Sequence, residues 1–105
     1  MAKKVTNSFQ IFMNETQHTG KAFMDMVMKL SQESALDRKT HELSYISVLA
    51  ATKMISGIDF HVKSAKELGA SKEEIKSAVL VGLPAVGITV VDALEIALDA
   101  YDTDD

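Results

Sequence analysis

The sequence predicts an all-α fold in one domain that spans residues 1–105. Three observations support this fold class. Apolar residues recur at helical spacing along nearly the whole chain, and no stretch alternates as a strand would. Helix-capping signals divide the chain into segments of ordinary helix length. A chain of 105 residues that is 47% hydrophobic and 25% charged has the length and composition of a single globular domain.

The N-terminal part predicts two helices, followed by a third. Asn7 or Ser8 can cap a short helix, and Gly20 is expected to separate it from the next. Asp37 is the expected N-cap of a helix that runs to about Met54. The apolar residues after Gly20 follow helical spacing and indicate core or interface packing: Ala22, Phe23, Met26, Val27 and Leu30.

Two capping boxes set the later boundaries. Ser56 is followed three residues on by Asp59, which predicts a helix from Ser56 to Leu68, and Gly69 supplies the left-handed stop after it. Ser71 and Glu74 repeat the pattern and open a last helical region, which extends from Lys72 to Tyr101. Three residues are expected to kink or break that region: Gly82, Pro84 and Gly87.

The last region also predicts a homo-oligomer. Its apolar residues cover all sides of the helix, so all sides need burial: Val79, Leu80, Val81, Leu83, Val86, Ile88, Val90 and Val91. A monomer of 105 residues has too little chain to provide that cover. Partner copies of the same chain are therefore expected to supply part of it.

Composition excludes several classes of function. The net charge of −4 argues against nucleic-acid binding, which needs clustered Lys and Arg. The absence of cysteine excludes disulfides, thiol redox chemistry and thiolate metal ligands within this chain. The longest uncharged stretch, 77–91, is too short and too broken to span a bilayer. No secretory signal is visible, so we expect a cytoplasmic protein without a membrane partner.

No cofactor or metal site is expected. The segment THELSY begins like a zinc-binding HExxH motif, but Tyr45 stands where the second histidine belongs. The glycines of TGKA and GLPAVG lack the spacing of phosphate or dinucleotide loops. His18 and His41 are predicted to face solvent, and we assign them no role.

Two titratable residues fall on apolar helix faces. In a projection down the helix axis, His61 falls within the apolar arc formed by Ile58, Val62, Ala65 and Leu68. In the same projection of the preceding helix, Glu42 falls between the directions of Ile46 and Leu49. Ionised groups on inward faces are costly unless paired, so both residues are candidates for an active site. Each also has a structural interpretation. His61 can be a core histidine that is hydrogen-bonded to backbone or to Glu42. Glu42 can be half of an ion pair, with Lys53 at the end of its stripe or with a neighbouring subunit.

The spacing alone does not bring Glu42 and His61 together. A straight helical hairpin that turns at Ser56 would leave them roughly 10 Å apart along the axis, at about 1.5 Å per residue. Contact would need a steep crossing, a kink, an intervening water or a subunit boundary.

Three segments, LDRKTHELSYISVLAA, HVKSAKELGASKEEIKSAVL and AVGITVVDALEIAL, resemble the carboxymuconolactone decarboxylase family, which also contains the alkylhydroperoxidase D-like proteins. The resemblance is strongest over residues 36–101. It implies an alkylhydroperoxidase D-like helical bundle that assembles as trimers or hexamers. In the peroxidase branch, a glutamate is followed after eleven residues by a CxxC and after three more by a histidine.

The resemblance implies proton-relay roles for Glu42 and His61, which stand at the family's separation of 19. Met54 and Gly57 occupy the two cysteine positions, so thiol peroxidase activity is not expected of this chain alone. The decarboxylase branch works without those cysteines, on a small carboxylated lactone. Arg38 is the only arginine, which leaves the particular lactone open. Lys53, Met54 and Gly57 are further candidates for substrate contact.

Two interpretations of function remain, and a third has less support. The first is a cofactor-independent decarboxylase or lactone-processing enzyme that uses His61 as general acid and base, with Glu42 orienting it. The second is a non-catalytic oligomeric binding or scaffold protein that kept the fold after losing the cysteines. The third is a redox complex in which a partner supplies the thiols.

Overall fold

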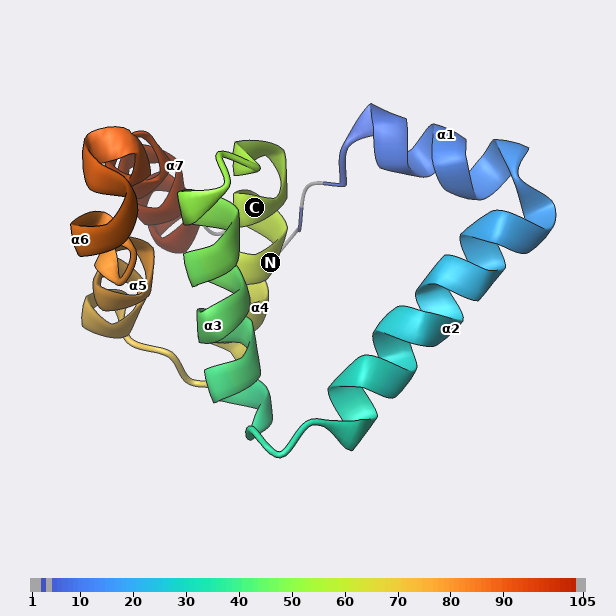
Figure 1. Ribbon diagram of the computed structural model, residues 1–105, viewed down its shortest axis with the longest axis horizontal. Coiled ribbons are helices and arrows are strands. Elements are labelled where there is room, and N and C mark those ends of the chain that lie inside the picture. Colours follow the sequence, from blue (N-terminus) through green and yellow to red (C-terminus); the bar gives the residue numbers. More distant parts are fainter. Residues whose placement is uncertain (1–2, 4, 104–105) are drawn as a thin grey trace.

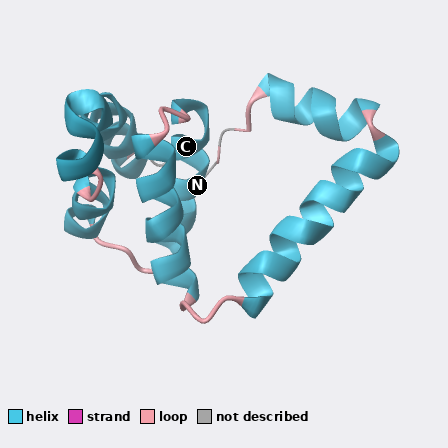
Figure 2. Cartoon of the chain, viewed as in Figure 1, coloured by secondary structure: helices cyan, strands magenta, loops and turns pink. Residues whose placement is uncertain are grey.

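A computed structural model describes residues 3 and 5–103, and all regular secondary structure in them is helical (Figures 1 and 2). The all-α prediction is confirmed. Two helices, α1 (Asn7–Glu15) and α2 (Gln17–Glu33), form the N-terminal part. The remaining elements are α3 (Arg38–Ala51), the 3₁₀ helix η1 (Ile55–Gly57), α4 (Ile58–Glu67), α5 (Lys72–Leu80), α6 (Leu83–Val86), the 3₁₀ helix η2 (Gly87–Val90) and α7 (Val91–Asp102).

The hydrophobic core lies between α3, α4, α5 and α7. Helix α3 packs against α4 and α5, and α7 packs against the same two helices. Half of the buried core residues are alanines, which lets the helix backbones approach closely. Helix α7 contributes three of them from one face, at spacings of four and three residues. The buried core consists of Ile46, Leu49, Ala50, Ile58, Val62, Ala65, Ala70, Ile75, Ala78, Val79, Val90, Ala93, Ala97 and Ala100.

Helices α1 and α2 form an arm that extends away from this core (Figure 1). The cap of α1 is Thr6, not Asn7 or Ser8, and its hydroxyl accepts a hydrogen bond from the Phe9 amide. The expected break at Gly20 is wrong, because the helix changes direction at Thr16 and Gly20 lies inside α2. Gly20 is needed for close approach, since a Cβ there would lie 3.2 Å from the Cα atom of Met13 in α1.

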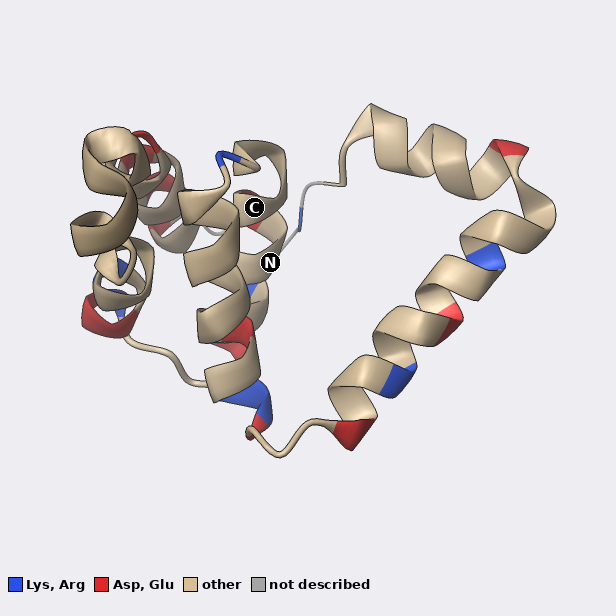
Figure 3. Cartoon of the chain, in the orientation of Figure 1, with Lys and Arg blue, Asp and Glu red and all other residues tan. Residues whose placement is uncertain are grey.

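The arm leaves much of its apolar surface exposed. Gly20 is the only buried residue among those described in α1 and α2. Lys21, Asp25, Lys29 and Glu33 recur every four residues and appear as alternating blue and red bands along α2 in Figure 3. Several apolar side chains elsewhere on α2 are exposed, among them Phe23, Met26, Met28 and Leu30. The arm therefore presents an uncovered apolar face in the single chain.

The boundaries around the α3–α4 connection differ in part from the prediction. Asp37 caps α3 as expected, with its carboxylate 2.7 Å from the Thr40 amide. The helix ends at Ala51, three residues earlier than Met54. The Ser56 capping box is wrong, because Ser56 lies in η1 and makes no side-chain cap to α4. The 3₁₀ turn leads directly into α4, so its own carbonyls accept the amides that a cap would otherwise satisfy.

The later helix boundaries agree with the prediction. Gly69 ends α4 in the left-handed conformation, at φ 97°. Ser71 and Glu74 form the expected capping box, with 3.0 Å between the Glu74 amide and the Ser71 hydroxyl and 2.9 Å between the Ser71 amide and the Glu74 carboxylate. The stretch from Lys72 to Asp102 is broken into four helical pieces.

The stretch from Lys72 to Asp102 would satisfy a membrane-span criterion by length and apolar composition alone. Core helices of water-soluble proteins satisfy the same criterion. Here the stretch folds back on itself, so that α5 packs against α7 and both line the core. The arrangement buries one side of the segment, and other apolar residues remain exposed: Val81, Leu83, Val86, Ile88 and Val91.

Candidate functional site

Glu42 and His61 form a direct hydrogen bond. Nδ1 of His61, on α4, lies 2.9 Å from Oε1 of Glu42, on α3. The side chains are 22% and 17% exposed, so solvent reaches the pair without surrounding it. Of the structural partners considered for Glu42, the structure gives His61 and not Lys53.

The early chain reversal after α3 brings the pair into register. The chain turns at Lys53, and the Met54 amide donates to the Leu49 carbonyl at 2.9 Å. Glu42 lies seven residues before Leu49, and His61 lies seven residues after Met54. The segment from Glu42 to Leu49 and the segment from Met54 to His61 therefore span similar distances along the bundle, at about 1.5–2 Å per residue. The expected 10 Å mismatch is therefore wrong, because the turn occurs at Lys53 and not at Ser56.

Two aromatic rings hold the His61 imidazole. The ring of Tyr45 stacks on it with centroids 4.2 Å apart and an interplanar angle of 22°. Phe60 meets it edge-on at 5.2 Å. Tyr45 follows Glu42 by three residues, so one face of α3 supplies both the hydrogen bond and the stacking surface. These contacts define the orientation of the ring.

The two imidazole nitrogens of His61 have different hydrogen-bonding roles. In neutral His61 the Nδ1–H group donates to Glu42, which leaves Nε2 as a proton acceptor. No partner for Nε2 is present in the part of the chain that the structure describes. A carboxylate–histidine pair of this kind can act as a general base or a general acid.

A cavity of about 270 Å³ lies on the other side of Glu42. It collects residues from α2, α3, α4 and the N-terminal segment: Lys3, Ser31, Arg38, His41, Glu42, Ser64, Glu67 and Leu68. His41 was assigned no role from the sequence, yet it lines this cavity. The signal was the spacing of Arg38, His41 and Glu42, which places all three on one face of α3.

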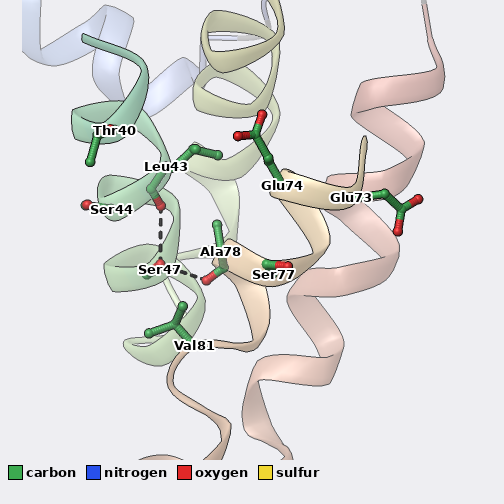
Figure 4. Close-up of a pocket in the computed structure, with 9 residues that line it drawn as sticks. All are labelled: Thr40, Leu43, Ser44, Ser47, Glu73, Glu74, Ser77, Ala78 and Val81. Atoms are coloured by element: carbon green, nitrogen blue, oxygen red, sulfur yellow. Dashed lines mark hydrogen bonds between the residues drawn. The ribbon is translucent and has the colours of Figure 1, made fainter. Parts of the chain in front are cut away.

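A larger cavity of about 550 Å³ lies in the groove between α3 and α5 (Figure 4). None of the predicted site residues lines it. The Ser47 hydroxyl lies 2.7 Å from the Ala78 carbonyl and 3.2 Å from the Leu43 carbonyl, so it links the two helices. The Lys39 ammonium at its edge lies 3.1 Å from Glu74. This groove has the features of a helix-packing surface and is separate from the Glu42–His61 pair.

The three further candidates lie in the connection between α3 and α4. Lys53 and Met54 are exposed, and Gly57 lies against the side chain of Leu49. None of the three lines either cavity. Lys53 does not continue the apolar stripe of α3, because the helix has already ended. Within residues 3 and 5–103, no group of three or more His, Asp or Glu side chains could hold a metal ion.

The comparison with known families gives the family of the chain. The profile of the carboxymuconolactone decarboxylase family matches residues 17–99, and the chain belongs to that family. The match begins before residue 36 and includes α2. Among curated proteins, the chain is similar to "Uncharacterized protein 4 in cox locus" of Paracoccus denitrificans, with 33% identity over 73 residues. That alignment covers 66% of each chain, so it spans just under two thirds of the relative.

No solved structure shows significant similarity to the chain. The family membership and the absence of cysteine together define the protein as a cysteine-free member. Met54 is an exposed thioether and Gly57 has no side chain, so neither can supply the thiolate that a dithiol mechanism requires.

Proposed function

We propose that the protein is a cofactor-independent enzyme that processes a small carboxylated substrate, as a decarboxylase or lactone-processing enzyme. The observation that carries the proposal is the 2.9 Å hydrogen bond between Glu42 and His61. It leaves Nε2 of an oriented, partly exposed imidazole available for proton transfer. The reaction class comes from the family to which the chain belongs.

The proposed chemistry centres on one proton at Nε2 of His61. Loss of CO₂ from the substrate leaves an electron pair on carbon, and the Nε2–H group of the imidazolium protonates that carbon. The imidazole is then neutral and regains a proton from solvent. Glu42 stabilises the charged form and keeps Nδ1 as the donor, so Nε2 remains the reactive nitrogen. Tyr45 and Phe60 keep the ring in place.

The test is turnover of a panel of carboxylated lactones and β-keto acids by His61→Ala and Glu42→Gln. Loss of general acid–base catalysis lowers the rate by about 10²-fold or more, so His61→Ala should lose at least that much. Glu42→Gln should lose less, because the imidazole remains. His18→Ala removes an exposed histidine of α2 and is the matched control. Turnover that survives unchanged in both site variants rules out the proposed mechanism.

The alternative function is a non-catalytic oligomeric binding or scaffold protein. The observation that favours it is that His61 does not line either cavity and has a structural partner in Glu42. A protein of this kind would turn over no member of the panel, while His61→Ala would still lower the free energy of unfolding. The third possibility, a redox complex with thiols from a partner, predicts peroxide consumption only when a thiol protein is added.

A homo-oligomer, a trimer or hexamer by analogy with the family, is part of the proposal. Two exposed apolar surfaces support it. One lies on α2, with Phe23 and Met26, and the other on α6 and η2, where Ile88 is 78% exposed. Exposed apolar patches of this kind mark interaction sites in soluble proteins. We place the protein in the cytoplasm, without nucleic-acid or membrane partners, on the basis of its composition.

A further inference from the structure

We propose that the cavity of about 270 Å³ beside Glu42 binds a carboxylate group of a small organic acid, with Arg38 as its principal ligand. The inference deepens the proposed function and rests on it only for the identity of the ligand as substrate. Binding itself is measured separately from turnover.

The carboxylates and the N-terminal lysine of the cavity are already paired. The Lys3 ammonium lies 3.0 Å from the Glu67 carboxylate, and Glu42 is bonded to His61. Arg38 has no hydrogen bond or ion pair within the part of the chain that the structure describes. Among the described residues that line the cavity, it is the one Lys or Arg without an anionic partner. A guanidinium presents a planar fork of donors that matches both oxygens of a carboxylate.

Neutral groups complete the cavity around Arg38. Ser31 and Ser64 offer hydroxyl donors, and the imidazole of His41 can donate from either ring nitrogen, depending on its tautomer. These groups come from three helices, so the cavity surrounds a ligand instead of touching it from one side. Its volume of about 270 Å³ is just below the usual range for drug-sized ligands, so a small organic acid fits it.

The position of Glu42 connects this cavity with the proposed chemistry. Glu42 lines the cavity and also bonds to His61. A carboxylate held by Arg38 would therefore share the cavity with Glu42, the partner of His61. The α3–α5 groove offers no comparable group, because the cation at its edge, Lys39, is paired with Glu74.

The experiment is a titration of the protein with succinate at low ionic strength. Binding is measured by isothermal titration calorimetry and by changes in the backbone amide chemical shifts. Succinamide, which has the same shape without charge, is the ligand control. We expect saturable succinate binding with shifts at His41 and Ser64, and no binding of succinamide. Arg38→Gln should weaken binding at least about tenfold, since hydrogen bonds to charged groups are the stronger ones. Arg38→Lys should give an intermediate loss, because lysine lacks the fork.

Lys29→Gln is the matched variant, because it removes the same charge from an exposed position of α2 outside the cavity. It should bind succinate as the unmodified protein does. Equal affinity in Arg38→Gln and the unmodified protein, no succinate binding, or shifts confined to another surface would each overturn the inference. The two proposals fail separately. Turnover that depends on His61 can persist without succinate binding, and binding that depends on Arg38 can persist when His61→Ala changes no rate.

Discussion

Lys53 adopts the left-handed backbone conformation, with φ 62°, at the residue where the chain turns back toward α4. Among the described residues it is the only one other than glycine with a positive φ. Such a conformation costs a residue with a Cβ roughly 1–2 kcal/mol, and glycine is the usual occupant of this position after a helix. The register of Glu42 and His61 therefore depends on a turn that the sequence does not mark with glycine.

At this position, Lys53→Gly should raise the free energy of unfolding by about 0.5–1 kcal/mol, because relief of the left-handed strain exceeds the added entropy of the unfolded chain. Urea unfolding measures the change. Lys53→Ala keeps a Cβ and should give no comparable gain. A destabilised Lys53→Gly protein would contradict this account of the turn. Turnover of the same variants tests whether the lysine side chain contacts substrate.

At the scale of the helices, two caps carry carboxylates whose pKa values are lowered. The Thr40 amide lowers the pKa of Asp37 at the start of α3. The hydrogen bond from the Ser71 amide is the main cause that lowers the pKa of Glu74 in the first turn of α5, and the hydrogen bond from Lys39 is the second. Because both carboxyl groups bind protons less readily in the folded state, their contribution to stability is present above the unfolded pKa values and is lost as the pH falls.

We therefore expect stability to fall as the pH drops below about 4, the range in which unfolded Asp and Glu titrate. Asp37→Asn keeps an oxygen that can cap α3 but removes the titration. Its urea midpoint should change less between pH 7 and pH 3 than that of the unmodified protein. An identical change in both proteins would show that the Asp37 cap does not contribute to acid sensitivity.

At the scale of the whole molecule, the exposed apolar side chains of the α1–α2 arm and of α6 and η2 have no covering partner within the described chain. The homo-oligomer proposed above would bury these side chains. Light scattering after gel filtration should then give a mass several times the 11.4 kDa of one chain. Met26→Lys in α2 and Ile88→Lys in η2 should each lower the oligomer mass, because a charge in an apolar interface must be desolvated.

The matched variant for this experiment is Asn14→Lys, which adds a lysine at an exposed polar position of α1. It should leave the oligomer mass unchanged. A single-chain mass for the unmodified protein at working concentrations would contradict the oligomer. It would also leave the exposed apolar side chains of the arm without an explanation.

Burial in this structure depends on neighbours more than on helix face. Lys63 carries a charge, yet its side chain is fully buried, 3.4 Å from the Asp59 carboxylate. The reverse holds for Val81 and Ile88, which are apolar and exposed. Helical period identifies a face, but the arrangement of the other helices decides whether that face is covered.

The sequence by itself determined the helical class, the caps at Asp37 and Ser71, the stop at Gly69 and the two residues of the candidate site, Glu42 and His61. These features depend on contacts between residues at most four positions apart, or on the family pattern, and both are visible in a linear string. The absence of cysteine likewise removed the thiol chemistry of the peroxidase branch without any structural information.

Only the tertiary structure decided that Glu42 and His61 meet, that Gly20 serves close packing and that Ser56 does not cap α4. It also brought Arg38 and His41 to the cavity beside Glu42. Each of these depends on where the chain reverses and on which helices pack together. A shift of three residues in one turn moves every side chain beyond it by several ångströms, and a local pattern does not record that shift.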